Sequence, residues 1–223
     1  RIVTHRDTLA MTPRLIWQFW HEASLPPEIA GWAGQWHDLH RRTWHHELWD
    51  AYDAEGFLHH KTPDLKRLWD ATPDRYPTDV WRQRADILRC ALLSVYGGIW
   101  LDTDMQPTGH TLDPLLPLGP TLCWERDGVA AIGLIATPPA SPFIERVREG
   151  MPNAFWRKNK LTRHSDTPIG PHYWTSHLGP DVTVLARDVC YPYGWREPRP
   201  AGLFPTSLMV HHWHSAPNRR HTP

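Results

Sequence analysis

Two acidic residues one position apart, Asp102 and Asp104, follow the apolar segment Ile99–Leu101 directly. In an extended chain alternate side chains project from the same face, so the two carboxylates are predicted to lie side by side. Neighbouring carboxylates repel each other, and a nearby cation relieves that repulsion. Hard oxygen ligands suit Mg²⁺ or Mn²⁺, which keep open positions for water and a diphosphate. The pair therefore predicts a divalent-metal site, although the same spacing also occurs in solvated loops.

The segment before this pair predicts the helix that positions it. Residues 79–96 show helical spacing of apolar side chains, with Asp79 as the expected N-cap, and Gly97-Gly98 ends the helix. Asp86 and Arg89 are three positions apart and therefore share one helix face, where a surface salt bridge is the alternative to a functional role. The side chains expected to face the core are Trp81, Ala85, Leu88, Leu92 and Val95.

Strands and helices are expected to alternate along the rest of the chain. This alternation predicts an α/β layered fold, in which ligands gather at the carboxyl ends of the strands. Strands are expected at residues 15–20, 46–49, 121–124, 131–136, 182–185 and 208–213, and helices from Pro27 to about Leu39, in one or two short pieces up to residue 71, and at 142–149.

Composition excludes several classes of protein. The 223 residues are 40% hydrophobic, and Lys plus Arg balance Asp plus Glu at 24 each. The content of apolar residues supports one folded domain, and the balanced charge argues against a nucleic-acid partner. No apolar run approaches the roughly 20 residues that cross a bilayer, so a cytoplasmic protein, soluble or peripheral at the membrane, is expected. The 14 tryptophans suit stacking on sugars or nucleobases, or simply fill the core.

The motif R-A-D-I-L-R…V-Y-G-G-I-W-L-D-T-D-M over residues 84–105 resembles the DXD-containing sugar-binding region of glycosyltransferase family 32. That family includes yeast mannosyltransferases and bacterial capsular-polysaccharide transferases, and it is related to the glucosylating domains of clostridial toxins. Residues 13–20 resemble the opening strand of the family, although Trp17 stands where the family has His. Residues 169–171 are similar to its T-G-P element, and residues 211–215 (H-H-W-H-S) to its C-terminal H-H-W-x-x-S-W.

The resemblance implies a fold and an activity. It implies one GT-A-type catalytic domain over residues 1–223, with 13–105 binding the nucleotide sugar and 106–215 binding the acceptor and closing the metal site. The expected reaction moves a sugar from a UDP- or GDP-sugar to a saccharide, lipid-linked or protein acceptor, with retention of anomeric configuration. Because Golgi relatives have a membrane anchor, which is not evident here, a bacterial or phage enzyme is expected.

The resemblance also implies roles for residues of the DXD region. Asp104 would ligate Mn²⁺ or Mg²⁺ directly, and Asp102 would bind the ion through water or hold the ribose. Asp86 and Arg89 would hold hydroxyls of the donor sugar. Arg84 and Phe19 are further candidates for binding the nucleotide sugar, and Trp20 would stack on the nucleobase unless it is an ordinary core residue.

The C-terminal motif is expected to complete the metal site. In an extended chain His212 and His214 share a face, so His212 with Ser215 is the preferred ligand pair, and His211 and His214 are substitutes. An exposed His-rich tail is the alternative. For a covalent intermediate, Glu125 and Asp166 are candidate nucleophiles, and front-face attack needs none.

The sequence is also compatible with two other classes of function. A non-catalytic carbohydrate-binding protein would explain the tryptophans, and sugar binding would then survive chelation. A metal-dependent phosphoesterase would explain the acidic pair and the histidines, and it would hydrolyse phosphodiesters without sugar transfer.

Overall fold

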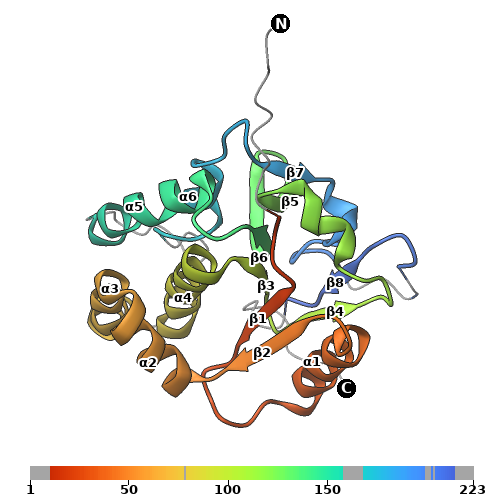
Figure 1. Cartoon of the computed structure of the whole chain (residues 1–223), viewed down its shortest axis with the longest axis horizontal. Coiled ribbons are helices and arrows are strands. Elements are labelled where there is room, and N and C mark those ends of the chain that lie inside the picture. The colour runs from red at the N-terminus through yellow and green to blue at the C-terminus, as the bar shows by residue number, and fades with distance from the viewer. Residues whose placement is uncertain (1–10, 78, 158–167, 199–201, 203, 214–223) are drawn as a thin grey trace, which may run out of the picture.

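A six-stranded sheet forms the centre of the molecule (Figure 1). The structure, a computed structural model, describes residues 11–77, 79–157, 168–198, 202 and 204–213. Only β6 runs antiparallel to its neighbours, and a separate antiparallel ribbon pairs β4 with β8. In spatial order the sheet consists of β2 (His45–Trp49), β1 (Leu15–Phe19), β3 (Gly98–Leu101), β6 (Val129–Thr137), β5 (Thr121–Arg126) and β7 (Thr183–Leu185), and the ribbon of β4 (Met105–Pro107) and β8 (Met209–His211).

Helices cover both faces of this sheet, which confirms the predicted α/β class (Figure 1). On one face several helices pack around α4, and α1 lies with the β4–β8 ribbon on the other side. The helices are α1 (Pro27–His40), α2 (Ala51–Lys61), α3 (Pro63–Arg75), α4 (Val80–Tyr96), α5 (Pro142–Trp156) and α6 (Pro171–Thr175), with short 3₁₀ turns η1 (Asp113–Leu118) and η2 (Arg187–Val189).

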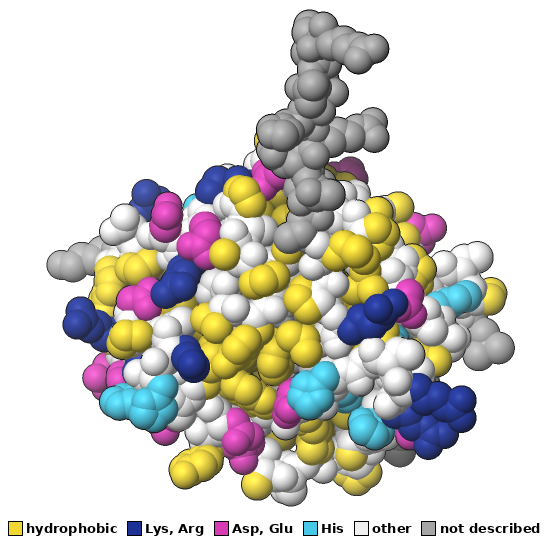
Figure 2. Space-filling model, in the orientation of Figure 1, with side chains coloured by type: hydrophobic (Ala, Val, Ile, Leu, Met, Phe, Trp, Pro, Cys, Tyr) yellow, Lys and Arg dark blue, Asp and Glu magenta, His cyan; other side chains and the backbone are white. Residues whose placement is uncertain are grey.

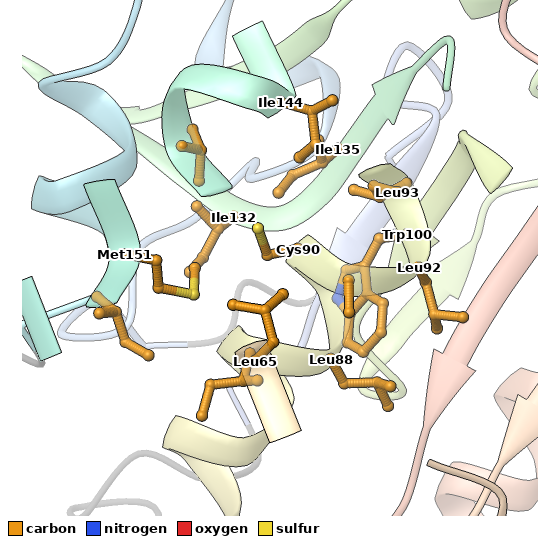
Figure 3. Close-up of a cluster of buried hydrophobic side chains, with 14 of the residues drawn as sticks. Leu65, Leu88, Cys90, Leu92, Leu93, Trp100, Ile132, Ile135, Ile144 and Met151 are labelled. Carbon is orange, nitrogen blue, oxygen red and sulfur yellow. The ribbon is translucent and has the colours of Figure 1, made fainter. Parts of the chain in front are cut away.

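The larger hydrophobic core lies between the sheet and helices α2 to α5. Side chains from α3, α4, β3, β6 and α5 meet there, as Figure 3 shows for Leu88 and Trp100 among others. Helix α4 is enclosed by the sheet on one side and by α3 and α5 on the other, so its residues from Asp86 to Ser94 are all buried. In this part of α4 the side chains on all sides of the helix are therefore buried, not only those of one stripe.

Two details of α4 differ from the sequence prediction. Trp81 is 36% exposed, so the expected core stripe is wrong at this position, whereas Ala85 and Val95 are partly buried and pack against the core as expected. The Asp79 side chain makes no cap hydrogen bond and instead lies 3.5 Å from Arg82. Both differences lie at the start of α4.

The glycine stop after α4 is confirmed, and its geometry explains why glycine is needed. Gly97 has φ 64° and ψ −155°, a backbone conformation that side-chain-bearing residues rarely adopt. A Cβ at Gly97 would lie 2.5 Å from the Pro139 nitrogen, and one at Gly98 would lie 2.8 Å from the Leu15 carbonyl oxygen. The chain can therefore pass from α4 into β3 through a single residue, Gly97.

All the predicted strands are present, with shifted ends. The strand expected at 208–213 stops at His211, and the helix expected at 142–149 continues to Trp156. Within the described residues no helix is both long and apolar enough to span a membrane. Figure 2 shows acidic, basic and histidine side chains interspersed on one face, around a central group of hydrophobic side chains.

Candidate active site

The carboxyl ends of β1, β3 and β5 lie at one edge of the sheet. Strands β1 and β3 are parallel, and β3 and β5 run in the same direction because both are antiparallel to β6. Helix α4 returns the chain to the start of β3, so the first turns of α4 lie at the same edge. Ligand sites of α/β proteins form at this edge, and the acidic pair follows β3 there.

Asp102 and Asp104 lie in a tight turn between β3 and β4 rather than in an extended strand. The Met105 N–H donates to the Asp102 carbonyl oxygen at 3.1 Å, which closes the turn. The expected strand alternation is therefore wrong, although the turn still brings both carboxylates to one place. Asp104 is 8% exposed, and the Asp102 side chain is 27% exposed.

Among the described C-terminal residues, His211 reaches the acidic pair. Its Nε2 lies 2.9 Å from Asp104 Oδ1, and β8 pairs with β4 so that His211 is opposite Met105. Burial by itself lowers the pKa of His211, but the charge of Asp104 and the hydrogen bond to it raise the pKa above its ordinary value. The imidazole is therefore held as a partner of the carboxylate.

His212 does not lie with the carboxylates, and this corrects the preferred assignment from the sequence. Its ring stacks on Trp32 at 4.2 Å, Nδ1 lies 3.2 Å from the Tyr193 hydroxyl, and Nε2 lies 2.9 Å from Gln106 Oε1. The reason is that β8 ends at His211 and Trp213 has φ 55°, so alternation does not continue along the chain. His214 and Ser215 lie outside the described residues.

Arg89 joins Asp86 to Asp102 in a buried group. Its Nη2 lies 3.1 Å from Asp86 Oδ1 and 3.3 Å from Asp102 Oδ1. The Trp100 indole N–H donates to the same Asp102 oxygen at 2.8 Å, and the Arg89 guanidinium lies 4.9 Å from the centre of the Trp100 ring. Asp86 and Arg89 are 2% and 4% exposed, so this pair is not a surface salt bridge.

Three side chains provide a donor set that fits a divalent cation. One ligand atom each from Asp102, Asp104 and His211 lie within 4.8 Å of one another. His211 Nδ1 is buried and has no hydrogen-bond partner in the described part of the chain. Two carboxylates and one imidazole are ordinary ligands for Mn²⁺, so the residues present fit the metal that the motif implies.

An aromatic group lies beside this edge, at the end of β1 and the start of α4. The His21 ring stacks on Trp81 at 4.6 Å, and Trp20 lies 5.3 Å from His21. The Arg84 guanidinium lies 4.9 Å from the Trp81 ring centre. Phe19 is only 7% exposed and packs in the core, so its predicted contact with a nucleotide is not supported by its position.

Of the two candidate nucleophiles, Glu125 and Asp166, only Glu125 lies in the described part of the chain. Glu125 lies near the end of β5, is 8% exposed, and pairs with Arg126 Nη1 at 2.7 Å. Asp166 lies outside the described residues. The position of Glu125 at the carboxyl edge keeps it as a candidate, and its role stays a prediction.

Sequence reasoning missed the stacking of Trp81 on His21 at this edge, and it kept His211, which pairs with Asp104, only as a substitute for His212. The first could be found from the position of Trp81 in the opening turn of a helix that leads into the acidic strand. The second depends on where β8 ends, for which residues 208–213 contain no turn signal.

Known proteins match part of this chain in sequence. Residues 26–120 match the family described as a glycosyltransferase sugar-binding region containing a DXD motif. Inositol phosphoceramide mannosyltransferase 3 of Schizosaccharomyces pombe is 34% identical over 108 residues, which are 48% of this chain and 28% of the relative. This chain thus corresponds to less than a third of that relative.

Solved structures show the fold. PaToxG glycosyltransferase superposes with a TM-score of 0.60 and 14% identity, over 76% of this chain and 69% of that one. A glycosyltransferase involved in glycosylation of the major capsid of PBCV-1 gives a TM-score of 0.46 and 12% identity, over 91% and 95% of the two chains, which is too low to add to the assignment.

The α/β fold is similar to that of the PaToxG glycosyltransferase and is of the GT-A type. Residues 26–120, less than half of the chain, are similar to the glycosyltransferase sugar-binding region that contains a DXD motif, and in this chain the motif is Asp102-Thr103-Asp104. The matched region includes the motifs of residues 84–105 on which the resemblance was based.

Proposed function

We propose that this chain transfers a hexose from a nucleotide sugar to a glycan, lipid-linked or protein acceptor, and that the reaction needs a divalent cation. Residues 13–105 bind the donor, and residues 106–215 bind the acceptor and supply the last metal ligand. The observation that carries the proposal is the convergence of Asp102, Asp104 and His211 at the carboxyl edge of a GT-A sheet.

The donor set favours Mn²⁺ over Mg²⁺. Mg²⁺ is held almost entirely by oxygen ligands, whereas Mn²⁺ is compatible with an imidazole, and His211 provides one. When bound, the ion neutralises charge on the departing nucleoside diphosphate. Asp102 and Asp104 hold the ion, and Arg89 and Trp100 fix the Asp102 carboxylate so that its geometry is set before the donor arrives.

Donor contacts are proposed on both sides of the acidic turn. Trp20, or Trp81 stacked on His21, offers an aromatic face to the nucleobase, with Arg84 beside it. Asp86 and Arg89 hold hydroxyls of the sugar, as the motif implies. Their burial and their bond to Asp102 indicate that they also stiffen the site.

Mannose is the first sugar to test, and a lipid-linked acceptor the first acceptor class. Both follow from the printed name of the relative, inositol phosphoceramide mannosyltransferase 3, which matches the DXD half of the chain. Retention of anomeric configuration is proposed with them, and product NMR measures it directly.

A donor panel with and without Mn²⁺ tests the proposal. Hydrolysis and transfer are measured for UDP- and GDP-sugars with the native chain, with Asp104→Asn and with Asp113→Asn. Asp113 pairs with exposed Arg14 away from the acidic turn and is the matched control. We expect metal-dependent turnover of one donor, loss of about 10²–10³-fold or more in Asp104→Asn, and native activity in Asp113→Asn.

Other outcomes separate the remaining function classes. Sugar binding that survives chelation and Asp104→Asn, with no turnover, would identify a carbohydrate-binding protein. Hydrolysis of a phosphodiester substrate without sugar transfer would identify a phosphoesterase. Either result would replace the transferase proposal.

A further inference from the structure

Tyr191 lies behind the acidic turn and has no exposed surface. Its hydroxyl oxygen accepts a hydrogen bond from the Leu134 N–H at 3.2 Å. A tyrosine hydroxyl is protonated at neutral pH, so this one retains a donor that the Leu134 contact does not use.

Gly133 on β6 lies beside both Asp102 and the Tyr191 hydroxyl. The Asp102 N–H donates to the Gly133 carbonyl oxygen at 2.8 Å. A Cβ built at Gly133 would lie 3.0 Å from Asp102 Oδ2 and 3.1 Å from the Tyr191 hydroxyl. The absent side chain at Gly133 therefore lets both oxygens occupy the same small space.

The Asp102 carboxylate is thus approached from two sides. Its Oδ1 receives the Trp100 indole N–H at 2.8 Å and faces Arg89. Its Oδ2 faces the region of Gly133 and the Tyr191 hydroxyl. A carboxylate enclosed in this way has few orientations left.

The ring of Tyr191 also packs on the other half of the metal site. Its centre lies 5.5 Å from that of His211 in an edge-to-face arrangement and 5.8 Å from that of Trp213. The His211 and Trp213 ring centres are 4.0 Å apart. One buried side chain therefore lies against His211 of β8 and Leu134 of β6, beside the acidic turn that follows β3.

We infer that Tyr191 is a positioning residue that sets Asp102 and His211 at the separation a divalent cation requires, with Gly133 as the gap that allows it. The inference rests on the proposed function, because it concerns the same metal site. Groups that orient metal ligands without touching the ion commonly change metal affinity by 10–100-fold when they are altered.

The test measures binding of Mn²⁺ alone to the full chain, by electron paramagnetic resonance and calorimetry. Tyr191→Phe keeps the ring and removes only the hydroxyl, and we expect the Kd for Mn²⁺ to rise about tenfold with a changed spectrum of the bound ion. Gly133→Ala is a second, independent variant, and we expect a similar rise because its methyl group displaces Asp102 Oδ2 or the phenol.

Tyr76→Phe is the matched control, because it removes another buried hydroxyl, one that donates to the Phe155 carbonyl oxygen at 2.8 Å between α3 and α5. It should lower the melting temperature and leave the Kd for Mn²⁺ unchanged. In the double variant of Tyr191→Phe with Asp102→Asn, the effects on log Kd should not add, because Tyr191 acts through Asp102.

Three results would count against the positioning role of Tyr191 or against the metal site itself. Native Mn²⁺ affinity in both Tyr191→Phe and Gly133→Ala would overturn the positioning role, and so would additive effects in the double variant. If instead the native chain itself binds no Mn²⁺, the metal site of the proposed function fails, and that failure is visible before any variant is made.

Discussion

At the scale of single residues, Arg89 provides the positive charge that faces two carboxylates of the site. Its guanidinium lies within 3.3 Å of two carboxylates, those of Asp86 and Asp102, and Arg89 as a whole is only 4% exposed. A buried charge that loses its partner is costly, because neither water nor another group replaces the lost interaction. Arg89 therefore affects folding as well as the position of Asp102.

Replacing Arg89 tests this directly. We expect Arg89→Met to lower the free energy of unfolding by about 3–5 kcal/mol, because the buried Asp86 carboxylate loses the charge of Arg89. Urea unfolding measures it. Arg14→Met is the control, since Arg14 pairs with Asp113 in solvent, and its effect should stay within about 1 kcal/mol. Equal losses in the two variants would contradict the argument.

The adjacent residues His211 and His212 should have different functions. We expect His211→Ala to raise the Kd for Mn²⁺ at least tenfold, as the loss of a ligand implies. His212→Ala removes the stack on Trp32 and the bonds to Tyr193 and Gln106, and it should cost about 1–3 kcal/mol of stability with the ligand set intact. Calorimetry with Mn²⁺ and urea unfolding distinguish the two, and the reverse pattern would restore His212 as the ligand.

At the scale of elements, the direct connection of α4 to β3 aligns the site. Helix α4 brings Asp86 and Arg89 to the sheet edge, and β3 brings Trp100 and Asp102. The connection is the single residue Gly97, so a small change there moves both elements relative to each other. Site geometry therefore depends on Gly97 and Gly98, neither of which provides a ligand side chain.

Gly97→Ala should be strongly destabilising. The residue has a positive φ, and the new Cβ would lie 2.5 Å from the Pro139 nitrogen. Strain and overpacking together predict a loss of at least about 3 kcal/mol. Gly31→Ala in α1 is the control: nothing lies within 4 Å of its Cβ, and a helical alanine should add about 0.5–1 kcal/mol. Thermal and urea unfolding report both changes, and a neutral Gly97→Ala would refute the prediction.

At the scale of the whole molecule, distant segments complete one site. The ribbon of β4 and β8 brings His211 to Asp104, 107 positions away in the chain. Helix α1 holds that ribbon: the Trp36 indole N–H donates to the Met105 carbonyl oxygen at 2.8 Å, and Trp32 stacks on His212. Global stability and metal-site geometry are therefore linked through α1.

The stability of the whole fold should fall in mild acid because of His46. Burial, followed by the neighbouring His37, His40 and His45, lowers the pKa of His46 from 6.5 to about 4. The folded chain thus binds this proton less readily than the unfolded chain. The contribution is complete above pH 6.5 and is lost as the pH falls from 6.5 to 4, by about 1–2 kcal/mol once solvent screening is allowed for.

Comparison with His46→Gln isolates that contribution. Urea unfolding between pH 7 and pH 4.5 should show a shallower loss of stability in the variant, because glutamine does not titrate and can still donate to Gln18 Oε1. Parallel pH profiles for the two proteins would show that His46 is not responsible.

The sequence by itself determined the α/β class, the strands and helices as far as β3, and the acidic pair. These features are local: helical spacing identified α1 and α4, two glycines identified the stop at Gly97, and the motif of residues 84–105 indicated the sugar-binding region that residues 26–120 match. Local backbone preferences and apolar periodicity act over a few residues, so they are visible in a linear pattern.

Only the tertiary structure decided which side chains meet. The pairing of His211 with Asp104, the burial of Arg89 between two carboxylates and the approach of Tyr191 to Asp102 all join segments far apart in the chain. Each depends on where a strand ends or turns. That is set by strand register and packing against other elements, which override local alternation and cannot be read from neighbouring residues.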